Sequence, residues 1–416
     1  MPTLLITGAA SGIGRAAALS FARDGWRCVL ADRDRPGLER LLAELPAPPD
    51  GRHAARDLDL TDPAQAARLG EGLPALDALV NNAGISDDSG TGLAEQPSAQ
   101  LDRLLALNLH APASVVDACA PRLRPGARIV NLASGAGLHA IPWRGAYSAS
   151  KAGLIAQTRA LARARPDLCV TALCPGFVRT ELVEGLIQAG RLRPDAAVGR
   201  IPLGRMAAPE ELARAIRFLA GPDAAPLRGG VLAVDGGSSV QGSSRPFEPA
   251  SQEPLPLDLP LRLDIDGGDA APWRGAAPSA GDGPGYEATL DLSPLDGPPG
   301  GLVRAVHAAA ARFAARRPAR ASLTLLLPAR PEPDWRRAGD AAAARMLVAT
   351  LACEWGGRAL RVNALELAPG IAPRTLHPLL RYVAGAAAQY LTGQVLECGD
   401  GLARVRPGVP TLKDHP

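Results

Sequence analysis

The stretch PTLLITGAASGIG, residues 2–14, passes from an apolar run into a glycine-rich turn and then into a helical pattern. A strand, a turn of this kind and a helix in succession form the context in which a glycine-rich turn binds a dinucleotide. Gly8, Gly12 and Gly14 let the backbone approach a pyrophosphate, and the helix N-terminus offers unpaired N–H groups and partial positive charge. We expect Ser11 and Ile13 of the same turn to contact the cofactor as well.

The pattern continues outward from this turn. From Pro2 to Val234, short β-branched or Leu-rich runs alternate with amphipathic helical stretches, which predicts an α/β fold with a Rossmann-type doubly wound parallel sheet. The expected strands are 3–7, 27–31, 76–81, 127–132, 168–173 and 231–234. The expected helices include 12–24, 99–122, 146–164 and 209–220.

The length of 416 residues exceeds what one hydrophobic core usually supports, so two domains are expected. Residues 241–260 belong to a Ser-, Pro- and Gln-rich stretch without periodicity, typical of a linker between domains 1–240 and 261–416. A Gly/Pro-rich stretch at 276–301 is expected to form a loop. The remaining C-terminal elements are expected to be helices 301–316 and 338–355 and strands 321–327, 358–366 and 393–397.

Composition excludes several classes of function. The 45 basic and 42 acidic residues are dispersed, without the like-charge run that would indicate nucleic acid binding. The six cysteines lack CxxC or Cys/His spacing, so we expect reduced core thiols and no metal. No secretory signal or membrane-length apolar run is present, which predicts a cytoplasmic protein that does not bind membranes.

Asp32 ends the second predicted strand, eighteen residues after Gly14. A carboxylate there can accept hydrogen bonds from the adenosine ribose hydroxyls and repel a 2′-phosphate, which favours NAD over NADP. Arg33 beside it keeps NADP open as the alternative. The turn Asn82-Ala83-Gly84 follows the next apolar strand, and its small residues let the main chain pass close to an adenine ring.

The strongest chemical signal is Ser134, Tyr147 and Lys151, after a strand and at a helix start. A spacing of four residues puts Tyr147 and Lys151 on one helix face, about 5–6 Å apart at Cβ. The ammonium would stabilise a phenolate and lower a phenol pKa of about 10 toward neutrality. Tyr147 could then exchange a proton with a substrate oxygen held by Ser134 while hydride moves at a nicotinamide.

In this order, the motifs resemble those of the short-chain dehydrogenase/reductase superfamily over residues 1–240. They are TGAASGIG (7–14), NNAG (81–84), Asn108 in LNL, Ser134, YSASK (147–151) and PGFVRT (175–180). The resemblance implies that Asn108 kinks a helix and holds a relay water. It also implies that Lys151 binds the nicotinamide ribose.

Further roles follow from the same resemblance. Asp59 and Leu60 are similar to the residues that contact adenine, with Asp57 as the alternative register. The nicotinamide carboxamide would be contacted in the segment containing Pro175, Gly176, Val178 and Thr180. The segment from Glu181 to Pro202 matches the position of a mobile substrate lid. His139, Trp143 and Arg144 lie where the family places substrate contacts, although packing roles are equally compatible with the sequence.

Residues 342–402 resemble a degenerate copy of the C-terminal half of the same family. LACEWGGRALRVNALELAPG and YLTGQVLECGDGL carry this resemblance, and alignment places Arg337 and Ala341 where the catalytic Tyr and Lys would stand. We therefore expect a non-catalytic, Rossmann-like pseudo-domain, packed either as an internal pseudo-dimer or as a separate appendage.

The sequence thus predicts an NAD(H)-dependent alcohol dehydrogenase or carbonyl reductase with a small-molecule alcohol or carbonyl substrate, assembled as a homodimer. A 3-oxoacyl thioester reductase that uses NADPH is the nearest alternative. A dinucleotide-sensing interaction protein is the alternative from a different class.

Overall fold

The computed structural model describes residues 1–49, 51–86, 97–139, 141, 146–190, 192–242, 246–276, 283–296, 301–329 and 335–399, with side chains omitted for 335–339. The chain divides into two compact units. Unit 1 comprises Met1–Leu192, Ala208–Pro222 and Arg228–Leu232. Unit 2 comprises Arg193–Ala207, Asp223–Leu227 and Ala233–Pro416. Three segments from the first 240 residues therefore cluster with the C-terminal region.

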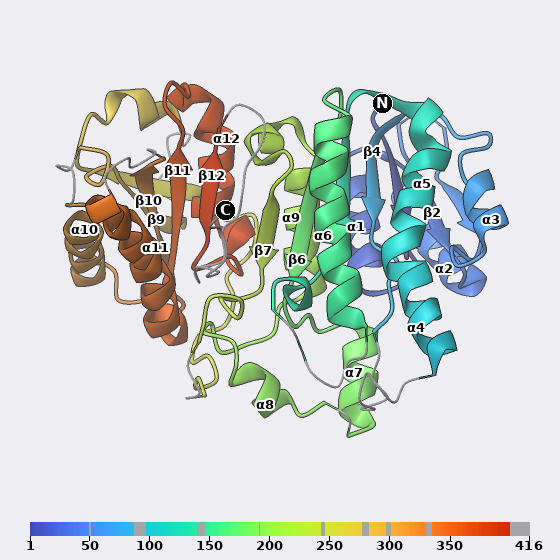
Figure 1. Cartoon of the computed structure of the whole chain (residues 1–416), viewed down its shortest axis with the longest axis horizontal. Helices are drawn as coiled ribbons and strands as arrows, with labels where there is room; N and C mark the ends of the chain where they lie inside the picture. Colours follow the sequence, from blue (N-terminus) through green and yellow to red (C-terminus); the bar gives the residue numbers. More distant parts are fainter. Residues whose placement is uncertain are drawn as a thin grey trace. The chain divides into compact units, whose positions relative to one another are not determined.

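Seven strands form the sheet of unit 1 in the order β3-β2-β1-β4-β5-β6-β7 (Figure 1). They are β1 (Thr3–Thr7), β2 (Arg27–Asp32), β3 (Ala54–Asp57), β4 (Leu76–Asn81), β5 (Leu123–Leu132), β6 (Cys169–Pro175) and β7 (Val231–Val234). The pairs from β3 through β6 are parallel. The predicted Rossmann-type sheet is confirmed, and β3 is a short, half-buried strand that sequence periodicity did not reveal.

Helices cover both faces of this sheet. They are α1 (Gly12–Arg23), α2 (Arg35–Glu44), α3 (Pro63–Arg68), α4 (Ser98–Leu105), α5 (Ala111–Cys119), α6 (Tyr147–Ala164), α7 (Glu181–Gln188) and α9 (Pro209–Leu219). In Figure 1, α5 and α6 lie in front of the sheet and α1 lies behind it. The front layer packs Leu, Val and Ala side chains such as Val115, Leu79 and Ile129, all fully buried, so apolar burial stabilises the sheet between its two helical layers.

The order of the strands determines where a ligand can bind. β1 pairs with β2 on one side and with β4 on the other, as in Leu4↔Cys28 and Leu4↔Ala78. After β1 the next strands are added on one side of the sheet, and from β4 onward they are added on the other side, so the strand order reverses between β1 and β4. In open α/β sheets a crevice forms beyond the carboxyl ends of the strands at this reversal.

Unit 2 contains a second, five-stranded parallel sheet in the order β12-β11-β10-β9-β8. Its strands are β8 (Leu261–Asp266), β9 (Tyr286–Asp291), β10 (Ala321–Pro328), β11 (Arg361–Leu367) and β12 (Val395–Cys398). Its main helices are α10 (Leu302–Arg316), α11 (Trp335–Trp355) and α12 (Pro373–Ala384), and the short α8 (Pro194–Val198) also belongs to this unit. Each strand pairs with the strand before it in the sequence, so this sheet has no reversal.

The prediction of a loop across 276–301 was wrong, because β9 lies inside it. In YEATLD, Tyr286, Ala288 and Leu290 are at most 2% exposed. β9 is an interior strand, covered on both faces. It has only six residues, so the glycines and prolines on either side dominate the composition of the 276–301 stretch. The composition of the whole stretch therefore led to the wrong prediction of a loop, whereas the alternation of apolar and polar residues in YEATLD would have indicated a strand.

Hydrogen bonds around β10–β12 repeat those around β5–β7. Gly229 N–H donates to Val170 O at 2.7 Å ahead of β7, and Gly393 N–H donates to Val362 O at 2.7 Å ahead of β12. Next to these bonds, Ala172 N–H donates to Gly230 O at 3.0 Å, as Ala364 N–H does to Gln394 O at 2.8 Å. The two sheets therefore share backbone geometry over three consecutive strands.

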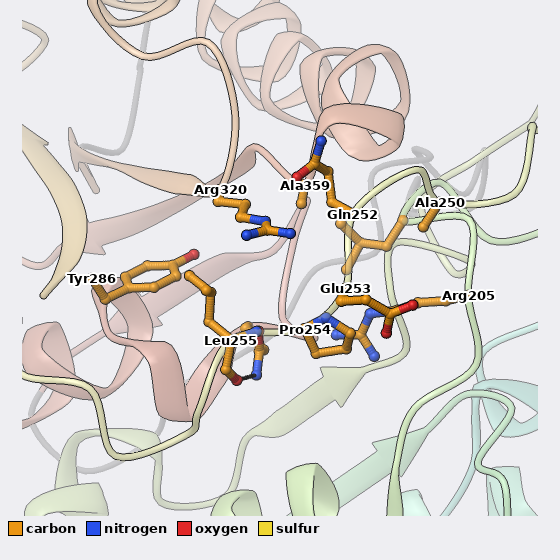
Figure 2. Close-up of a pocket in the computed structure, with 11 residues that line it drawn as sticks. Arg205, Ala250, Gln252, Glu253, Pro254, Leu255, Tyr286, Arg320 and Ala359 are labelled. Carbon is orange, nitrogen blue, oxygen red and sulfur yellow. Dashed lines mark hydrogen bonds between the residues drawn. The ribbon is translucent and has the colours of Figure 1, made fainter. Parts of the chain in front are cut away.

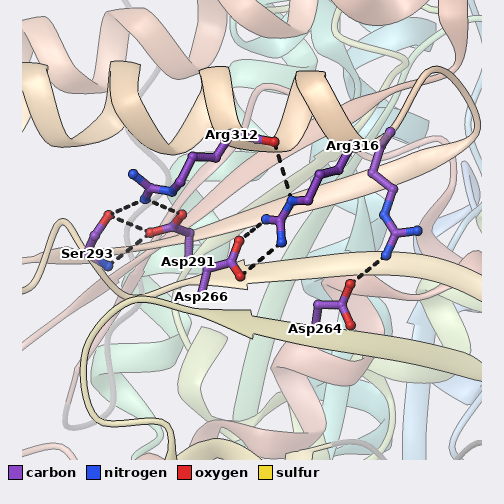
Figure 3. Close-up of polar contacts among 7 residues, drawn as sticks. Asp264, Asp266, Asp291, Ser293, Arg312 and Arg316 are labelled. Atoms are coloured by element: carbon purple, nitrogen blue, oxygen red, sulfur yellow. Dashed lines mark hydrogen bonds and ion pairs between the residues drawn. The ribbon is translucent and has the colours of Figure 1, made fainter.

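Aspartates at the ends of β8 and β9 are neutralised by arginines of α10 (Figure 3). Asp266 and Asp291 are register partners. Arg316 pairs with Asp266, and Arg312 donates to Asp291 at 2.7 Å and to Ser293 Oγ at 2.9 Å. These ion pairs tie α10 to the sheet edge, so the aspartates do not form a free acidic site.

Candidate active site

A cavity of about 580 Å³ opens at the carboxyl ends of the strands of unit 1, beyond the neighbouring strands β1 and β4. It is lined by every expected catalytic and cofactor-binding residue except Asn108 and Gly14. These are Gly8, Ser11, Gly12, Ile13, Asp32, Arg33, Asp59, Leu60, Asn82, Ala83, Gly84, Ser134, Tyr147, Lys151, Pro175, Gly176, Val178 and Thr180. The structure thus brings together residues as far apart in the sequence as Gly8 and Thr180.

The glycine-rich turn has no room for side chains. Gly8 and Gly12 have φ of +64° and +53°, in the left-handed region that favours glycine. A Cβ on Gly14 would lie 2.1 Å from Gly8 O, and one on Gly8 would lie 2.8 Å from Ala83 Cα. Gly14 therefore lets the helix pack against the turn behind the cavity, which explains why it does not line the cavity itself.

Asn82 ties the end of β4 to this turn. Its Nδ2 donates to Thr7 O at 3.0 Å and to Gly8 O at 2.8 Å. In return, Thr7 Oγ1 accepts from the N–H groups of Asn82 and Ala83, both at 3.1 Å. The floor of the cavity is thereby held by side-chain to main-chain bonds between the two diverging strands.

Two aspartates, Asp32 and Asp59, also line the cavity. Asp32 accepts from Ala10 N–H at 2.9 Å and from Asp34 N–H at 3.0 Å, which anchors the glycine-rich turn to the end of β2. Asp59 accepts from the N–H and the hydroxyl of Thr61, and these bonds are the main cause of a lowered carboxyl pKa. Of the two alternatives for the adenine contact, Asp59 lines the cavity and Asp57, the last residue of β3, does not.

Lys151 is nearly inaccessible to solvent, with 4% of its surface exposed. Its ammonium donates to Leu132 O at 2.9 Å and lies 5.9 Å from the centroid of the Tyr147 ring. Burial lowers the pKa of Lys151 to about 8, so the group stays largely protonated at neutral pH. A buried cation therefore stands beside the phenol at the start of α6.

Asn108 lies in a π-helical segment, η2 (Ala106–His110), between α4 and α5. Its Oδ1 accepts from Ile85 N–H at 2.9 Å, and its Nδ2 donates to Ile85 O at 2.8 Å and to Ser150 Oγ at 3.2 Å. Ser150 Oγ donates in turn to Tyr147 O at 2.8 Å. Asn108 thus stands behind the cavity and connects the loop after β4 to the first turn of α6.

The remaining predicted residues differ in whether they line the cavity. Ser134 Oγ accepts from Ala136 N–H at 3.1 Å and caps the 3-10 turn η4 (Gly135–Gly137) while lining the cavity. His139 is exposed and does not line the cavity, and Trp143 and Arg144 lie outside the described residues. Of the expected lid, α7 walls the cavity through Leu182, Val183 and Leu186, whereas α8 clusters with unit 2.

Sequence reasoning did not identify Ser150 or assign a role to Glu181. Ser150 lies inside the YSASK motif, one residue before Lys151, so its proximity could have been inferred. Glu181 reaches Gly12 across 169 residues, which no local pattern reveals.

A much smaller pocket lies in unit 2. Figure 2 shows a pocket there near Arg320 and Tyr286 with a volume of about 20 Å³. The Nε of Arg320 is buried without a hydrogen-bond partner, and the pocket is roughly the size of one water molecule. This pocket is too small for an organic substrate.

The described residues hold no group of three or more His, Cys, Asp or Glu side chains that could bind a metal ion. Within the same residues, no helix has the length and apolar character needed to cross a membrane.

Comparisons with known proteins agree on one family. A family model described as enoyl-(acyl carrier protein) reductase matches residues 8–239. The uncharacterized short-chain type dehydrogenase/reductase y4vI of Sinorhizobium fredii is 43% identical over 240 residues, which span 56% of this chain and 43% of that protein. The 3-oxoacyl-[acyl-carrier-protein] reductase FabG of Thermotoga maritima is 36% identical over 241 residues, spanning 56% of this chain and 96% of FabG.

A solved structure gives the same result for the fold. ElxO with NADP bound superposes with a TM-score of 0.52 and 26% identity, over 58% of this chain and 99% of that chain. Because the family model covers more than half of the chain, the resemblance seen in the motifs is confirmed: over about its first 240 residues this protein belongs to the short-chain dehydrogenase/reductase superfamily, whose members are oxidoreductases that bind a nicotinamide cofactor.

Proposed function

We propose that unit 1 transfers hydride between NAD(H) and a secondary alcohol or ketone, with Ser134, Tyr147, Lys151 and Asn108 as the groups that handle the substrate oxygen and its proton. The observation that carries this proposal is the buried Lys151 ammonium beside the Tyr147 ring. Within the part of the chain that the structure describes, the ammonium donates to a neutral carbonyl, that of Leu132. Burial of a lysine in this way costs stability, and a catalytic role for its charge accounts for that cost.

The residues present fit a nicotinamide dinucleotide. The glycine-rich turn has no space for a Cβ at Gly8 or Gly14, as the tight turn and the close helix packing of a dinucleotide-binding fingerprint require. The first two residues of α1, Gly12 and Ile13, line the cavity, and a helix N-terminus favours the binding of phosphate. When bound, the nicotinamide ring donates or accepts the hydride.

The protein's own groups would manage the proton. Tyr147 Oη would give a proton to a carbonyl oxygen, or take it from a carbinol. The Lys151 ammonium stabilises the phenolate electrostatically in a site of low dielectric. Ser134 Oγ would donate a hydrogen bond that holds the substrate oxygen near Tyr147. Asn108 fixes the first turn of α6 through Ser150 and thereby orients Tyr147.

Preference for NAD rests on Asp32. Its carboxylate lines the cavity at the end of β2, where it would bond the ribose hydroxyls and repel a 2′-phosphate. Arg33 lines the same part of the cavity and would favour the phosphate instead. The similarity to ElxO with NADP bound adds weight to NADP, so the choice depends on which charge dominates.

Calorimetric titration of the full chain with NADH and separately with NADPH tests this proposal. One NADH site per chain, with NADPH weaker by tenfold or more, is the expected result. Asp32→Ala should reverse the preference. Equal or tighter binding of NADPH would contradict the NAD assignment, and absence of binding for both would contradict the enzyme assignment.

A second candidate is reduction of 3-oxoacyl thioesters with NADPH. It is favoured by the similarity to the 3-oxoacyl-[acyl-carrier-protein] reductase FabG and by the enoyl-(acyl carrier protein) reductase family model. Oxidation of NADPH in the presence of a 3-oxoacyl thioester, with no turnover of simple ketones, would select this candidate.

We also propose that residues 261–416 form a non-catalytic copy of the family's C-terminal half, after a linker at 241–260. The hydrogen bonds shared by β5–β7 and β10–β12 support this relation. The sheet in chain order lacks the reversal at which dinucleotides bind. In addition, α11 contains neither tyrosine nor lysine in its sequence. One dinucleotide site per chain is the matching expectation.

A further inference from the structure

The glycine-rich turn is already engaged by a carboxylate from a distant part of the chain. Glu181 Oε2 accepts a hydrogen bond from Gly12 N–H at 2.9 Å. Gly12 is the first residue of α1, whose N-cap residue Ser11 makes no side-chain capping bond and whose first turn has no acidic residue. Glu181 therefore supplies from outside the negative charge that the N-terminus of α1 lacks.

A second contact brings the same two segments together. A Cβ on Gly12 would lie 3.1 Å from Thr180 Cγ2. The glycine-rich turn therefore lies close to Thr180 as well as to Glu181, at the start of α7. Thr180 caps α7, since its Oγ1 accepts from Val183 N–H at 3.4 Å, and Glu181 is the first residue of that helix. Motion of Glu181 is thus coupled to the helix that walls the cavity.

We infer that Glu181 is a latch that occupies the pyrophosphate position and sets the affinity for the dinucleotide. This inference rests on the proposed dinucleotide site. A phosphate oxygen and the Glu181 carboxylate cannot both accept from Gly12 N–H, and their like charges repel at that distance. Cofactor binding therefore exchanges one anion for the other and releases the start of α7 from the turn.

The latch makes a selective prediction about ligands. Removing the Glu181 carboxylate should increase the affinity for every ligand that carries the pyrophosphate, including ADP-ribose, NADH and NADPH. Adenosine, which has no phosphate, should bind with unchanged affinity. Because a charge-assisted hydrogen bond is the interaction replaced, we expect a gain of roughly tenfold in ADP-ribose affinity.

The experiment is calorimetric titration of the full chain with ADP-ribose and with adenosine. The variants are Glu181→Ala, which removes the bond, and Glu181→Gln, which keeps a weaker neutral acceptor and preserves the side-chain volume. Glu184→Gln is the matched control, because Glu184 lies on the same helix but pairs with Arg179 instead of Gly12.

The expected order of ADP-ribose affinity is Glu181→Ala above Glu181→Gln above wild type, with Glu184→Gln equal to wild type. Equal affinities in all four proteins would overturn the latch while leaving the dinucleotide site intact. An equal gain in Glu184→Gln, or a gain for adenosine, would also overturn it, since a general charge or packing effect would then be responsible. If no protein bound ADP-ribose or NADH, the proposed function itself would fail, and the latch with it.

Discussion

Gly126 and Arg320 hold equivalent positions in the two sheets. Each lies two residues before a paired strand residue, Arg128↔Cys169 in unit 1 and Ser322↔Arg361 in unit 2. Gly126 has φ of +79° and Arg320 has φ of +51°. The N–H of Gly126 donates to Asp167 O at 2.7 Å, and that of Arg320 donates to Arg358 O at 3.1 Å. Unit 2 therefore keeps a left-handed turn without the glycine that suits it.

Replacing Arg320 with glycine should stabilise unit 2. A left-handed backbone costs a non-glycine residue about 1–2 kcal/mol, and the Arg320 Nε is buried without a partner. After the entropy of an added glycine, we expect Arg320→Gly to raise the free energy of unfolding by about 1 kcal/mol. Urea denaturation measures this change. Gly126→Arg should act in the opposite direction, and a destabilised Arg320→Gly would contradict the strain argument.

Removing the Tyr147 hydroxyl should separate chemistry from binding. Tyr147→Phe keeps the ring over Lys151 but loses the proton donor, so turnover with an alcohol or ketone should fall by about 10²–10⁴-fold. NADH affinity should stay within twofold of wild type. Steady-state rates and titration calorimetry provide the two measurements, and Ser148→Ala, on the same helix turn, should leave both unchanged. Retained turnover in Tyr147→Phe would remove Tyr147 from the mechanism.

The buried Lys151 ammonium should lower the free energy of unfolding by an amount that depends on pH. Its pKa is lowered from 10.5 to about 8 in the folded chain, so between these values the unfolded chain binds more protons. Stability linked to this group therefore rises with pH from about 8 to 10.5. Lys151→Met should be inactive yet more stable at pH 7, by on the order of 3 kcal/mol. That advantage should shrink toward pH 10, whereas a pH-independent difference would show that desolvation of the ammonium is not its cause.

Cutting the chain after residue 242 should destabilise what remains. Gly236 N–H donates to Tyr390 O at 3.0 Å, and Tyr390 Oη donates to Arg205 O at 3.0 Å. A fragment 1–242 loses Tyr390 and exposes Ile201 and Val234, which are buried in the full chain. We expect lower solubility and a lower melting temperature than for a chain ending at residue 399. Equal stability of the two fragments would show that these contacts contribute little.

Local chemistry explains which parts of the site could be predicted. Gly8 and Gly12 are needed for their backbone conformation, which a short stretch of sequence reveals. The four-residue spacing of Tyr147 and Lys151 likewise predicts that they share one face of a helix. The hydrogen bond that Asp32 accepts from Ala10 and the bond between Glu181 and Gly12 depend on how distant elements pack. The contact of Glu181 could be recognised only once Gly12 and Thr180 were seen to meet.

The fold was predictable where burial produces a clear period. β4 and β7 have the bounds that the sequence predicted. β9 was missed because its flanking glycines and prolines dominate the composition, although Tyr286 and Leu290 are fully covered. The hydrophobic period did not reveal the π segment around Asn108, since one wider turn leaves the apolar spacing of the 99–122 run nearly unchanged, and only the family resemblance pointed to a helix kink there.

The chain-order sheet of unit 2 has a consequence for the timing of synthesis. Each of its strands can pair with the strand made just before it, so the sheet can grow one strand at a time as the chain emerges. In contrast, Ile201 and Gly236 leave the ribosome more than 150 residues before Tyr390, against which Gly236 packs. The segment around Gly236 must therefore wait, incompletely buried, until the chain has been translated as far as Tyr390.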